Sequence, residues 1–335
     1  MRVAILAPVA WRTPPRHYGP WEQVASNIAE GLINLGIDIT LFATGDSITT
    51  GKLSAICDIG YEEDRSQDAK VLECLHISNL MEQASEFDII HNNFDFLPLT
   101  YSGLIKSPVI TTIHGFSSPK IIPVYKKYNS IGHYVSISNA DRSPDLDYLA
   151  TVYNGLNTKD FEFNDKPDDY LLYFGRIHPD KGTAEAIEIA QKSKRKLFIA
   201  GIIQDENYFN EKIKPQLNQQ IEYIGAAGPE RRNYLLGKAF ALLHPINFNE
   251  PFGMSVAEAM LCGTPVIAFN KGAMPELIKH EQTGFLVDNV DEAAEAVDRL
   301  KNIRRQDCYN WAVSQFSSDK MVSDYLKLYE QILSL

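Results

Sequence analysis

The chain has 335 residues, of which 44% are hydrophobic, and a formal net charge of −11 that is spread along its length. This length fits two domains of about 150 residues each, and the acidic balance argues against a broad nucleic-acid-binding surface. The short apolar run at the N-terminus suits a first strand better than a signal peptide, and no run reaches membrane-spanning length. We therefore expect a cytoplasmic protein with at most peripheral membrane contact.

The four cysteines argue against a metal or redox centre. Cys57, Cys74, Cys262 and Cys308 form no CxxC pair and have no nearby histidine in a ligand-like spacing. Free thiols also fit a reducing compartment. We expect no bound metal and no cofactor.

Short apolar runs alternate with helix-length segments along the whole chain, as is typical of buried parallel strands joined by helices. This alternation predicts an α/β protein built from two doubly wound, Rossmann-like halves. Ligands bind beyond the carboxyl ends of such strands, so we expect a cleft between the two halves. The runs lie at residues 3–6, 39–42, 88–91, 109–113, 134–137 and 150–153, and then at 171–174, 196–200, 221–224, 241–244, 265–268 and 285–287.

A polar, turn-rich stretch between residues 154 and 170 marks the domain boundary. The sequence predicts an N-terminal domain over residues 1–157 and a C-terminal domain over residues 158–310. The remaining helical segment, 311–335, is long for a final element and can pack back on the first domain.

Three strand ends in the second half carry groups suited to a phosphate-bearing ligand. The first is followed by Gly175-Arg176 and then by Lys181-Gly182. The arginine offers a planar fork, the lysine offers a point charge, and the glycines allow close backbone approach. Incidental surface charge in a loop is the alternative explanation. A second glycine turn follows the next strand at Gly201.

The third strand end leads to two glutamates eight residues apart, Glu250 and Glu258. Gly253 lies between them, and the apolar stretch after it is predicted to form a helix. Glu250 then lies in the loop before the helix, and Glu258 lies inside it. Unpaired N–H groups at Gly253, Met254 and Ser255 carry the positive end of the helix dipole and suit an anion. Glu258 has mostly apolar neighbours and needs a partner, either a ligand hydroxyl or a basic side chain.

These segments resemble the retaining, nucleotide-sugar-dependent glycosyltransferases of family 4. That family has the GT-B fold, in which two Rossmann-like domains face each other across a cleft. The resemblance implies a hexosyltransferase that moves a hexose from a nucleoside-diphosphate sugar to an acceptor hydroxyl without a metal. A UDP-hexose is the first expectation for the donor and GDP-mannose the second. The matching pieces are Gly175-Arg176 with Lys181-Gly182, Glu250 with Glu258, and the segments 263–266, 272–276 and 283–287.

The resemblance also implies roles for single residues. The basic pair would hold the donor diphosphate, the first glutamate the sugar hydroxyls, and the second glutamate the ribose. The amides at the helix start would face the sugar and the phosphate. The catalytic candidates are Glu250, His114, Arg176 and Lys181, and the donor-binding candidates are Glu258, Gly253, Met254, Ser255 and Gly201.

The first half agrees less closely with the family pattern. His114 follows a strand where the family places a histidine near the reacting sugar, although a core histidine is the alternative. For His91, after the preceding strand, the core interpretation is the simpler one. The family's Gly-Gly pair is replaced by Tyr18-Gly19-Pro20-Trp21, in which Pro20 removes a backbone donor. Whether this loop contacts phosphate or acceptor is left open. The acceptor-side candidates are Gly19, Trp21 and His91.

Other patterns carry less weight. Asp145 and Asp147 match the DxD pattern by which another glycosyltransferase class holds a metal, but a surface position explains them better in so acidic a chain. His244 is expected to be a core histidine. The alternative functions are a nucleotide-sugar epimerase or a sugar phosphorylase on the same fold, or a non-catalytic nucleotide-sugar-binding subunit. The expected partners are a nucleotide sugar and a carbohydrate or small hydroxylated acceptor, with no nucleic acid.

Overall fold

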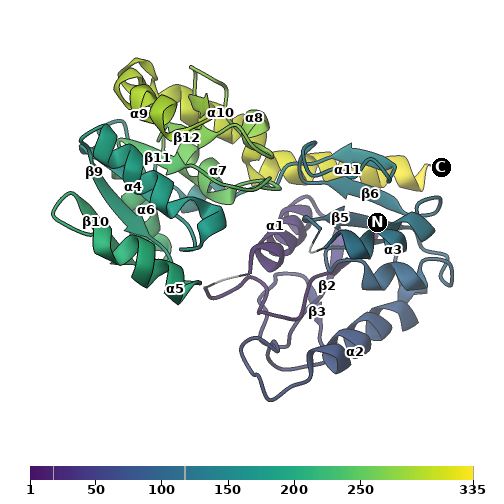
Figure 1. Cartoon of the computed structure of the whole chain (residues 1–335). Coiled ribbons are helices and arrows are strands. Elements are labelled where there is room, and N and C mark those ends of the chain that lie inside the picture. The colour runs from purple at the N-terminus through teal and green to yellow at the C-terminus, as the bar shows by residue number, and fades with distance from the viewer. Residues whose placement is uncertain (18, 117, 335) are drawn as a thin grey trace. The chain divides into compact units, whose positions relative to one another are not determined.

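The computed structural model describes residues 1–17, 19–116 and 118–334. The chain divides into two compact units (Figure 1). Unit 1 comprises Met1–Leu156 with Ser318–Leu335, and unit 2 comprises Asn157–Ser317. The sequence analysis put the same junctions at 157/158 and 310/311. Tyr18 of the predicted acceptor-side loop and Leu335 of the predicted last segment lie outside the described residues.

A sheet of seven parallel strands forms the centre of unit 1. Strand β1 lies between β2 and β4, so the direction of winding reverses at the β1/β4 boundary, where such sheets bind ligands. The edge strand β3 was not predicted, because its three residues are too few and too exposed to leave a periodic apolar signal. In sheet order the strands are β3 (Lys52–Ser54), β2 (Asp38–Phe42), β1 (Arg2–Leu6), β4 (Ile89–Asn92), β5 (Val109–Ile113), β6 (His133–Ser136) and β7 (Tyr148–Thr151).

Helices cover both faces of this sheet. Helices α1 (Pro20–Asn34) and α11 (Ser318–Leu333) share one apolar core with the central strands, and α2 (Ala69–Glu82) packs into a second core with residues from β1, β2 and β4. The short helix α3 (Ile122–Lys127) contributes Tyr125 to a third cluster. The first unit therefore has the doubly wound arrangement that the apolar runs predict.

The last helical segment of the chain is two helices rather than one. Helix α10 (Arg305–Phe316) belongs to unit 2, and α11 begins at Ser318 and belongs to unit 1. In Figure 1, α11 is the yellow helix at the C-terminus. Its buried residues recur at helical spacing: Met321, Val322, Tyr325, Leu328, Tyr329 and Ile332. Because Gly31 of α1 has no side chain, α11 approaches so closely that a Cβ there would lie 2.4 Å from Val322 Cγ2.

Unit 2 repeats the architecture with six parallel strands. Strand β8 lies between β9 and β11, so the winding reverses at the β8/β11 boundary. In sheet order the strands are β10 (Ile221–Gly225), β9 (Lys196–Ala200), β8 (Tyr170–Phe174), β11 (Ala241–His244), β12 (Val266–Phe269) and β13 (Gly284–Val287). Besides α10, the helices are α4 (Thr183–Lys192), α5 (Glu206–Tyr208), α6 (Pro229–Lys238), α7 (Met254–Leu261), α8 (Met274–Leu277) and α9 (Val290–Arg299). The two parallel sheets confirm the predicted α/β class with two Rossmann-like domains.

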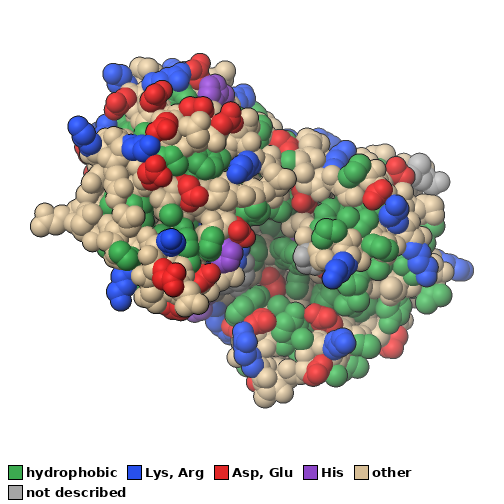
Figure 2. Space-filling model, viewed as in Figure 1, with side chains coloured by type: hydrophobic (Ala, Val, Ile, Leu, Met, Phe, Trp, Pro, Cys, Tyr) green, Lys and Arg blue, Asp and Glu red, His purple; other side chains and the backbone are tan. Residues whose placement is uncertain are grey.

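Charged side chains of both signs are interspersed on the face that Figure 2 shows. The two acids of the DxD pattern lie on the surface of unit 1. Asp145 pairs with Lys126 at 3.3 Å, and Asp147 accepts a hydrogen bond from Asn129 at 2.7 Å. Within the described ranges, none of the helices combines the length and the apolar character needed to cross a membrane.

Candidate functional site

The loops after β8, β9 and β11 meet at the carboxyl edge of the second sheet. Gly201 has φ +153°, and a Cβ there would lie 1.8 Å from the carbonyl oxygen of Gly175. Gly182 has φ +74°, and a Cβ there would lie 1.8 Å from the carbonyl oxygen of Pro245. Only glycine allows such contact. Gly201 therefore lets the loop after β9 contact the loop after β8, and Gly182 lets the loop after β8 contact the loop after β11. Both contacts lie by the β8/β11 boundary, the topological switch point of this sheet. Gly201, a donor-binding candidate, thus holds two loops in place.

Lys181 and Glu250 meet at this edge, although 69 residues separate them in sequence. The lysine Nζ lies 2.5 Å from Glu250 Oε2, and their side chains are only 16% and 14% exposed. The same Nζ lies 4.6 Å from the centre of the Phe248 ring. A lysine and a glutamate that are both mostly buried therefore lie in contact at the β8/β11 boundary and form a lysine–glutamate corner. Each of the two side chains can exchange its partner for a group of a ligand.

His244 is a third member of this corner. Its Nε2 lies 3.9 Å from Glu250 Oε2 and has no hydrogen-bond partner in the described part of the chain. Burial lowers the pKa of His244 to about 4, so the ring is neutral at pH 7 and offers a hydrogen bond rather than a charge. The sequence analysis treated His244 as a core residue, and only its position at the end of β11 could have indicated more.

The start of α7 lies next to Glu250 in the chain. Gly253 is the N-cap with φ 97°, and no side chain caps this end. Met254 and Ser255 are partly exposed, so their N–H groups lie at an accessible helix N-terminus. The backbone of the Glu250 loop is fixed by the N–H of Ala273, which donates to the Glu250 carbonyl at 2.9 Å. The structure thus combines an open helix start with the lysine–glutamate corner.

Glu258 lies a little more than one turn inside α7 and pairs with a basic side chain. Arg232 of α6 places Nη1 3.0 Å from Glu258 Oε1 and stacks its guanidinium 5.2 Å from the Phe161 ring. Burial raises the pKa of Glu258, and the nearby Arg232 opposes that rise. The Nε of Arg232 has no hydrogen-bond partner among the residues described. Sequence reasoning predicted that Glu258 needs a partner but did not identify Arg232, which no local pattern marks.

Arg176 has partners other than the lysine–glutamate pair. Its Nη1 donates to the Gln204 side chain, and its carbonyl accepts a hydrogen bond from the Tyr173 hydroxyl at 2.8 Å. The guanidinium is partly exposed at the end of β8. The loop therefore offers two cations on one sheet edge, one paired with a carboxylate and one bound to a neutral amide.

His114 and Trp21 lie together in unit 1. Their rings stack with centroids 5.5 Å apart, and His114 Nε2 lies 3.1 Å from Asn93 Oδ1. Burial lowers the pKa of His114 to about 3, so it is neutral at pH 7. Its Nδ1 and the Asn93 amide nitrogen have no hydrogen-bond partner within the described ranges.

His91 has a different environment. The ring is fully buried, with Nδ1 2.6 Å from the Tyr329 hydroxyl and Nε2 2.7 Å from Thr112 Oγ1. Both ring nitrogens are engaged in a network that joins β4 to α11, so His91 has no free group for an acceptor. Among the acceptor-side candidates, His91 is therefore a core residue.

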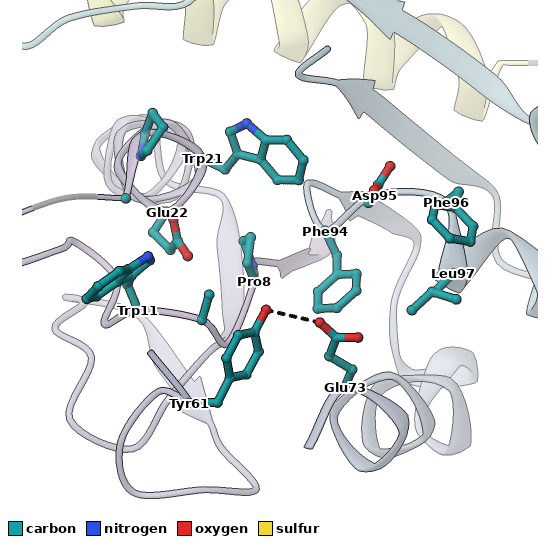
Figure 3. Close-up of a pocket in the computed structure, with 13 residues that line it drawn as sticks. Pro8, Trp11, Trp21, Glu22, Tyr61, Glu73, Phe94, Asp95, Phe96 and Leu97 are labelled. Carbon is teal, nitrogen blue, oxygen red and sulfur yellow. Dashed lines mark hydrogen bonds between the residues drawn. The ribbon is translucent and has the colours of Figure 1, made fainter. Parts of the chain in front are cut away.

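Gly19 and Trp21 line a pocket of about 480 Å³ in unit 1 (Figure 3). The other lining residues come from the loops after β1 and β4, from a loop at Tyr61 and from helices α1 and α2. Sequence reasoning missed most of them, because they are spread over several segments without a common motif. They include Trp11, Glu22, Glu73 and Asp95.

Comparisons with known proteins indicate a glycosyltransferase. Residues 157–312 match the family model described as glycosyl transferases group 1. An uncharacterized glycosyltransferase of Methanocaldococcus jannaschii is 23% identical, over 88% of this chain and 88% of that protein. The family match lies entirely in unit 2, and together these findings support glycosyltransferase activity.

Solved structures share the fold over the whole chain. AviGT4, a glycosyltransferase involved in avilamycin A biosynthesis, has a TM-score of 0.73 and 22% identity, with 100% of this chain and 98% of that chain covered. Anabaena HepE, crystallised with UDP and glucose, has a TM-score of 0.74 and 17% identity, with 99% and 100% covered. The chain therefore has the GT-B fold of these solved structures.

Proposed function

We propose that this protein is a retaining hexosyltransferase that uses a nucleoside-diphosphate sugar and needs no metal. The observation that carries the proposal is the Lys181–Glu250 pair at the β8/β11 switch point, next to the open start of α7. A nucleotide sugar offers an anion and several hydroxyls, which are the two kinds of group that this corner accepts. A UDP-hexose is our first choice, supported by the UDP and glucose bound to HepE, and GDP-mannose is the second.

The donor diphosphate binds through Lys181, Arg176 and the N–H groups of residues 253–255. As the glycosidic bond breaks, the departing diphosphate gains negative charge. Preorganised donors aimed at such charge contribute about 3 kcal/mol each to transition-state stabilisation. The two fixed cations supply the charge that a divalent ion supplies in other glycosyl transfers, which is the reason for proposing metal independence.

The two glutamates bind hydroxyls. Glu250 accepts hydrogen bonds from the donor sugar once Lys181 turns to the diphosphate, and His244 adds a neutral nitrogen beside it. Glu258 accepts hydrogen bonds from the ribose, and Arg232 opposes the rise of its pKa that burial causes. Each acid thus exchanges part of a protein ion pair for ligand hydroxyls, with its own charge retained.

Retention follows from attack on the same face that the diphosphate leaves. The acceptor hydroxyl forms the new bond to the anomeric carbon, the bond to the phosphate oxygen breaks, and that oxygen takes the acceptor's proton. Glu250 is bound to Lys181 and serves as a hydroxyl ligand in this scheme, not as a nucleophile. Unit 1 binds the acceptor molecule. His114 orients the sugar by hydrogen bonding. Because burial lowers the pKa of His114, the ring is neutral and acts without a charge of its own.

The test is proton NMR of the EDTA-treated protein with UDP-glucose or GDP-mannose and water as the slow acceptor. We expect the α-hexose to be released first from one donor, before mutarotation, and at a rate strongly reduced in Lys181→Ala. Initial release of the β-hexose would contradict retention, and a requirement for Mg²⁺ would contradict metal independence. A donor epimerised without release would show an epimerase, and a bound but unchanged donor would show a non-catalytic binding protein.

A further inference from the structure

The pocket of unit 1 lies at its switch point, beside the ends of β1 and β4. It has a volume of about 480 Å³. Trp21 forms one wall, Trp11 and Tyr61 form another, and Phe94 lies between them (Figure 3). Flat aromatic faces of this kind present apolar surface to the C–H face of a sugar ring while leaving its hydroxyls to polar groups.

The polar groups of the pocket are acids. Only 3% of the Glu22 surface is exposed, and Glu73 and Asp95 are partly buried. The Tyr61 hydroxyl donates to Glu73 at 3.0 Å, and the Tyr125 hydroxyl donates to Asp95 at 2.7 Å. A carboxylate has about four lone-pair positions for accepting hydrogen bonds, so each of these acids can accept one more from a ligand hydroxyl.

No lysine, arginine or histidine is among the described residues that line the pocket. A phosphate or carboxylate brought into it would meet three acids with no counter-charge, and a charge buried without a partner is strongly unfavourable. Burial already raises the pKa of Glu22 to about 7 and raises that of Asp95, so the pocket disfavours the ionised form of these acids. The lining therefore discriminates against anions.

One acid of the pocket lining, Asp95, has an unusual backbone conformation. Asp95 has φ 143°, a backbone conformation that is uncommon for a non-glycine residue and that clusters at functional sites. It is held there by Tyr125 and by Asn92, whose amide donates to the Asp95 carbonyl at 2.7 Å. The lining ring of Trp21 is held by stacking on His114, with the two ring centroids 5.5 Å apart.

We infer that this pocket binds the acceptor as a saccharide ring without negative charge, with the ring against the aromatic walls and its hydroxyls on Glu22, Glu73 and Asp95. The inference rests on the proposed function, because it names the acceptor class of that transfer. It excludes sugar phosphates and uronic acids from the ring that occupies the pocket. The charge of more distant parts of the acceptor is left free.

The test uses tryptophan emission. Of the three tryptophans in the chain, Trp11 and Trp21 line the pocket, and Trp311 lies in unit 2. A Trp311→Phe protein, checked for unchanged thermal unfolding, is titrated with glucose, N-acetylglucosamine, maltose and cellobiose. The anionic counterparts are glucose 6-phosphate, N-acetylglucosamine 6-phosphate and glucuronic acid. We expect saturable changes with at least one neutral sugar, and binding about tenfold or more weaker for its anionic counterpart.

Charge reversal at one lining position provides the decisive variant. Glu73→Lys should narrow or invert the preference for the neutral sugar, whereas Glu82→Lys makes the same change on an exposed, non-lining position of α2 and should leave it intact. Trp21→Ala should weaken the neutral sugar at least about tenfold. The inference is overturned if no neutral sugar binds, if the anionic sugars bind equally well, or if Glu73→Lys behaves like Glu82→Lys.

Parallel titration with UDP and GDP separates this inference from the proposed function. If a nucleotide binds and the sugar preference is absent, only the acceptor class is wrong. If neutral sugars bind as expected and no nucleotide binds, the pocket assignment stands and the proposed transfer reaction is wrong.

Discussion

The two units share one architecture and differ in the chemistry of their switch points. Beyond β8 and β11, unit 2 presents two cations, with Lys181 held against Glu250 at 2.5 Å beside an open helix start. Beyond β1 and β4, unit 1 presents aromatic rings and acids, with no cation in the described lining. Doubly wound topology thus gives each unit a switch point, and the side chains there make only that of unit 2 suited to a diphosphate.

The largest expected effect comes from removing the cation from unit 2. Lys181→Ala should lower the rate of transfer or donor hydrolysis by about 10²–10³-fold, because one preorganised group that stabilises the leaving diphosphate is lost. The measurement is the initial rate of UDP or GDP release at saturating donor. Lys192→Ala is the matched control, since this exposed lysine of unit 2 also pairs with a carboxylate, Asp291. Equal rates in the two variants would mean that Lys181 does not stabilise the leaving diphosphate at the switch point of unit 2.

A second change tests how the loops of unit 2 are held. Gly201→Ala places a Cβ against the Gly175 carbonyl oxygen at φ +153°, and overpacking together with strain should cost about 2–4 kcal/mol of unfolding free energy. Gly225→Ala has a positive φ of +78° but open space, so it isolates the strain, and Gly228→Ala has neither. Chemical denaturation should rank Gly201→Ala as the least stable. If Gly225→Ala were as unstable, the close loop contact would contribute nothing.

A third change sharpens the role of the buried acid of unit 2. Glu258→Gln should weaken nucleoside diphosphate binding by about tenfold, because an ionised acceptor for the ribose hydroxyls is lost. Arg232→Gln should weaken it less, since the carboxylate remains although its partner is gone. Calorimetric titration of both variants gives the order. The opposite order would assign the ligand contact to Arg232.

The smallest expected effect concerns the acid of unit 1. The pKa of Glu22 is raised from 4.5 to about 7 by burial, so the folded state binds its proton more tightly than the unfolded state. Its protonation stabilises the fold below pH 4.5, and this stabilisation is lost as the pH rises through 7. Glu22→Gln should therefore gain about 1 kcal/mol on the wild type between pH 5 and pH 6. Thermal unfolding of Glu22→Gln and of the exposed control Glu82→Gln measures this. A constant difference across that range would mean that Glu22 is ionised throughout.

Most of the fold could be predicted from the sequence because buried parallel strands are apolar runs between turn residues. The exception, β3, is three residues long and lies at an exposed edge. The break between α10 and α11 at Ser317 was also missed, since helical periodicity continues on both sides and only the tertiary packing of each helix separates them.

The candidate site was predicted in part. Lys181 and Glu250 were each found from loop chemistry and the family pattern, but their ion pair depends on contact between β8 and β11 that no local signal encodes. Arg232 and His244 were missed for the same reason, because a site residue and a core residue look alike until their neighbours are known. The pocket of unit 1 draws on the loops after β1 and β4, on the Tyr61 loop and on helices α1 and α2, and only the folded chain brings these segments together.

The most direct test of the account is isothermal titration of the EDTA-treated protein with UDP and GDP. The account predicts that one nucleotide binds without metal, and that its affinity falls at least about tenfold in Lys181→Ala and stays unchanged in Lys192→Ala. Binding of neither nucleotide, or equal binding by the wild type and Lys181→Ala, would contradict the assignment of the β8/β11 switch point as the donor diphosphate site.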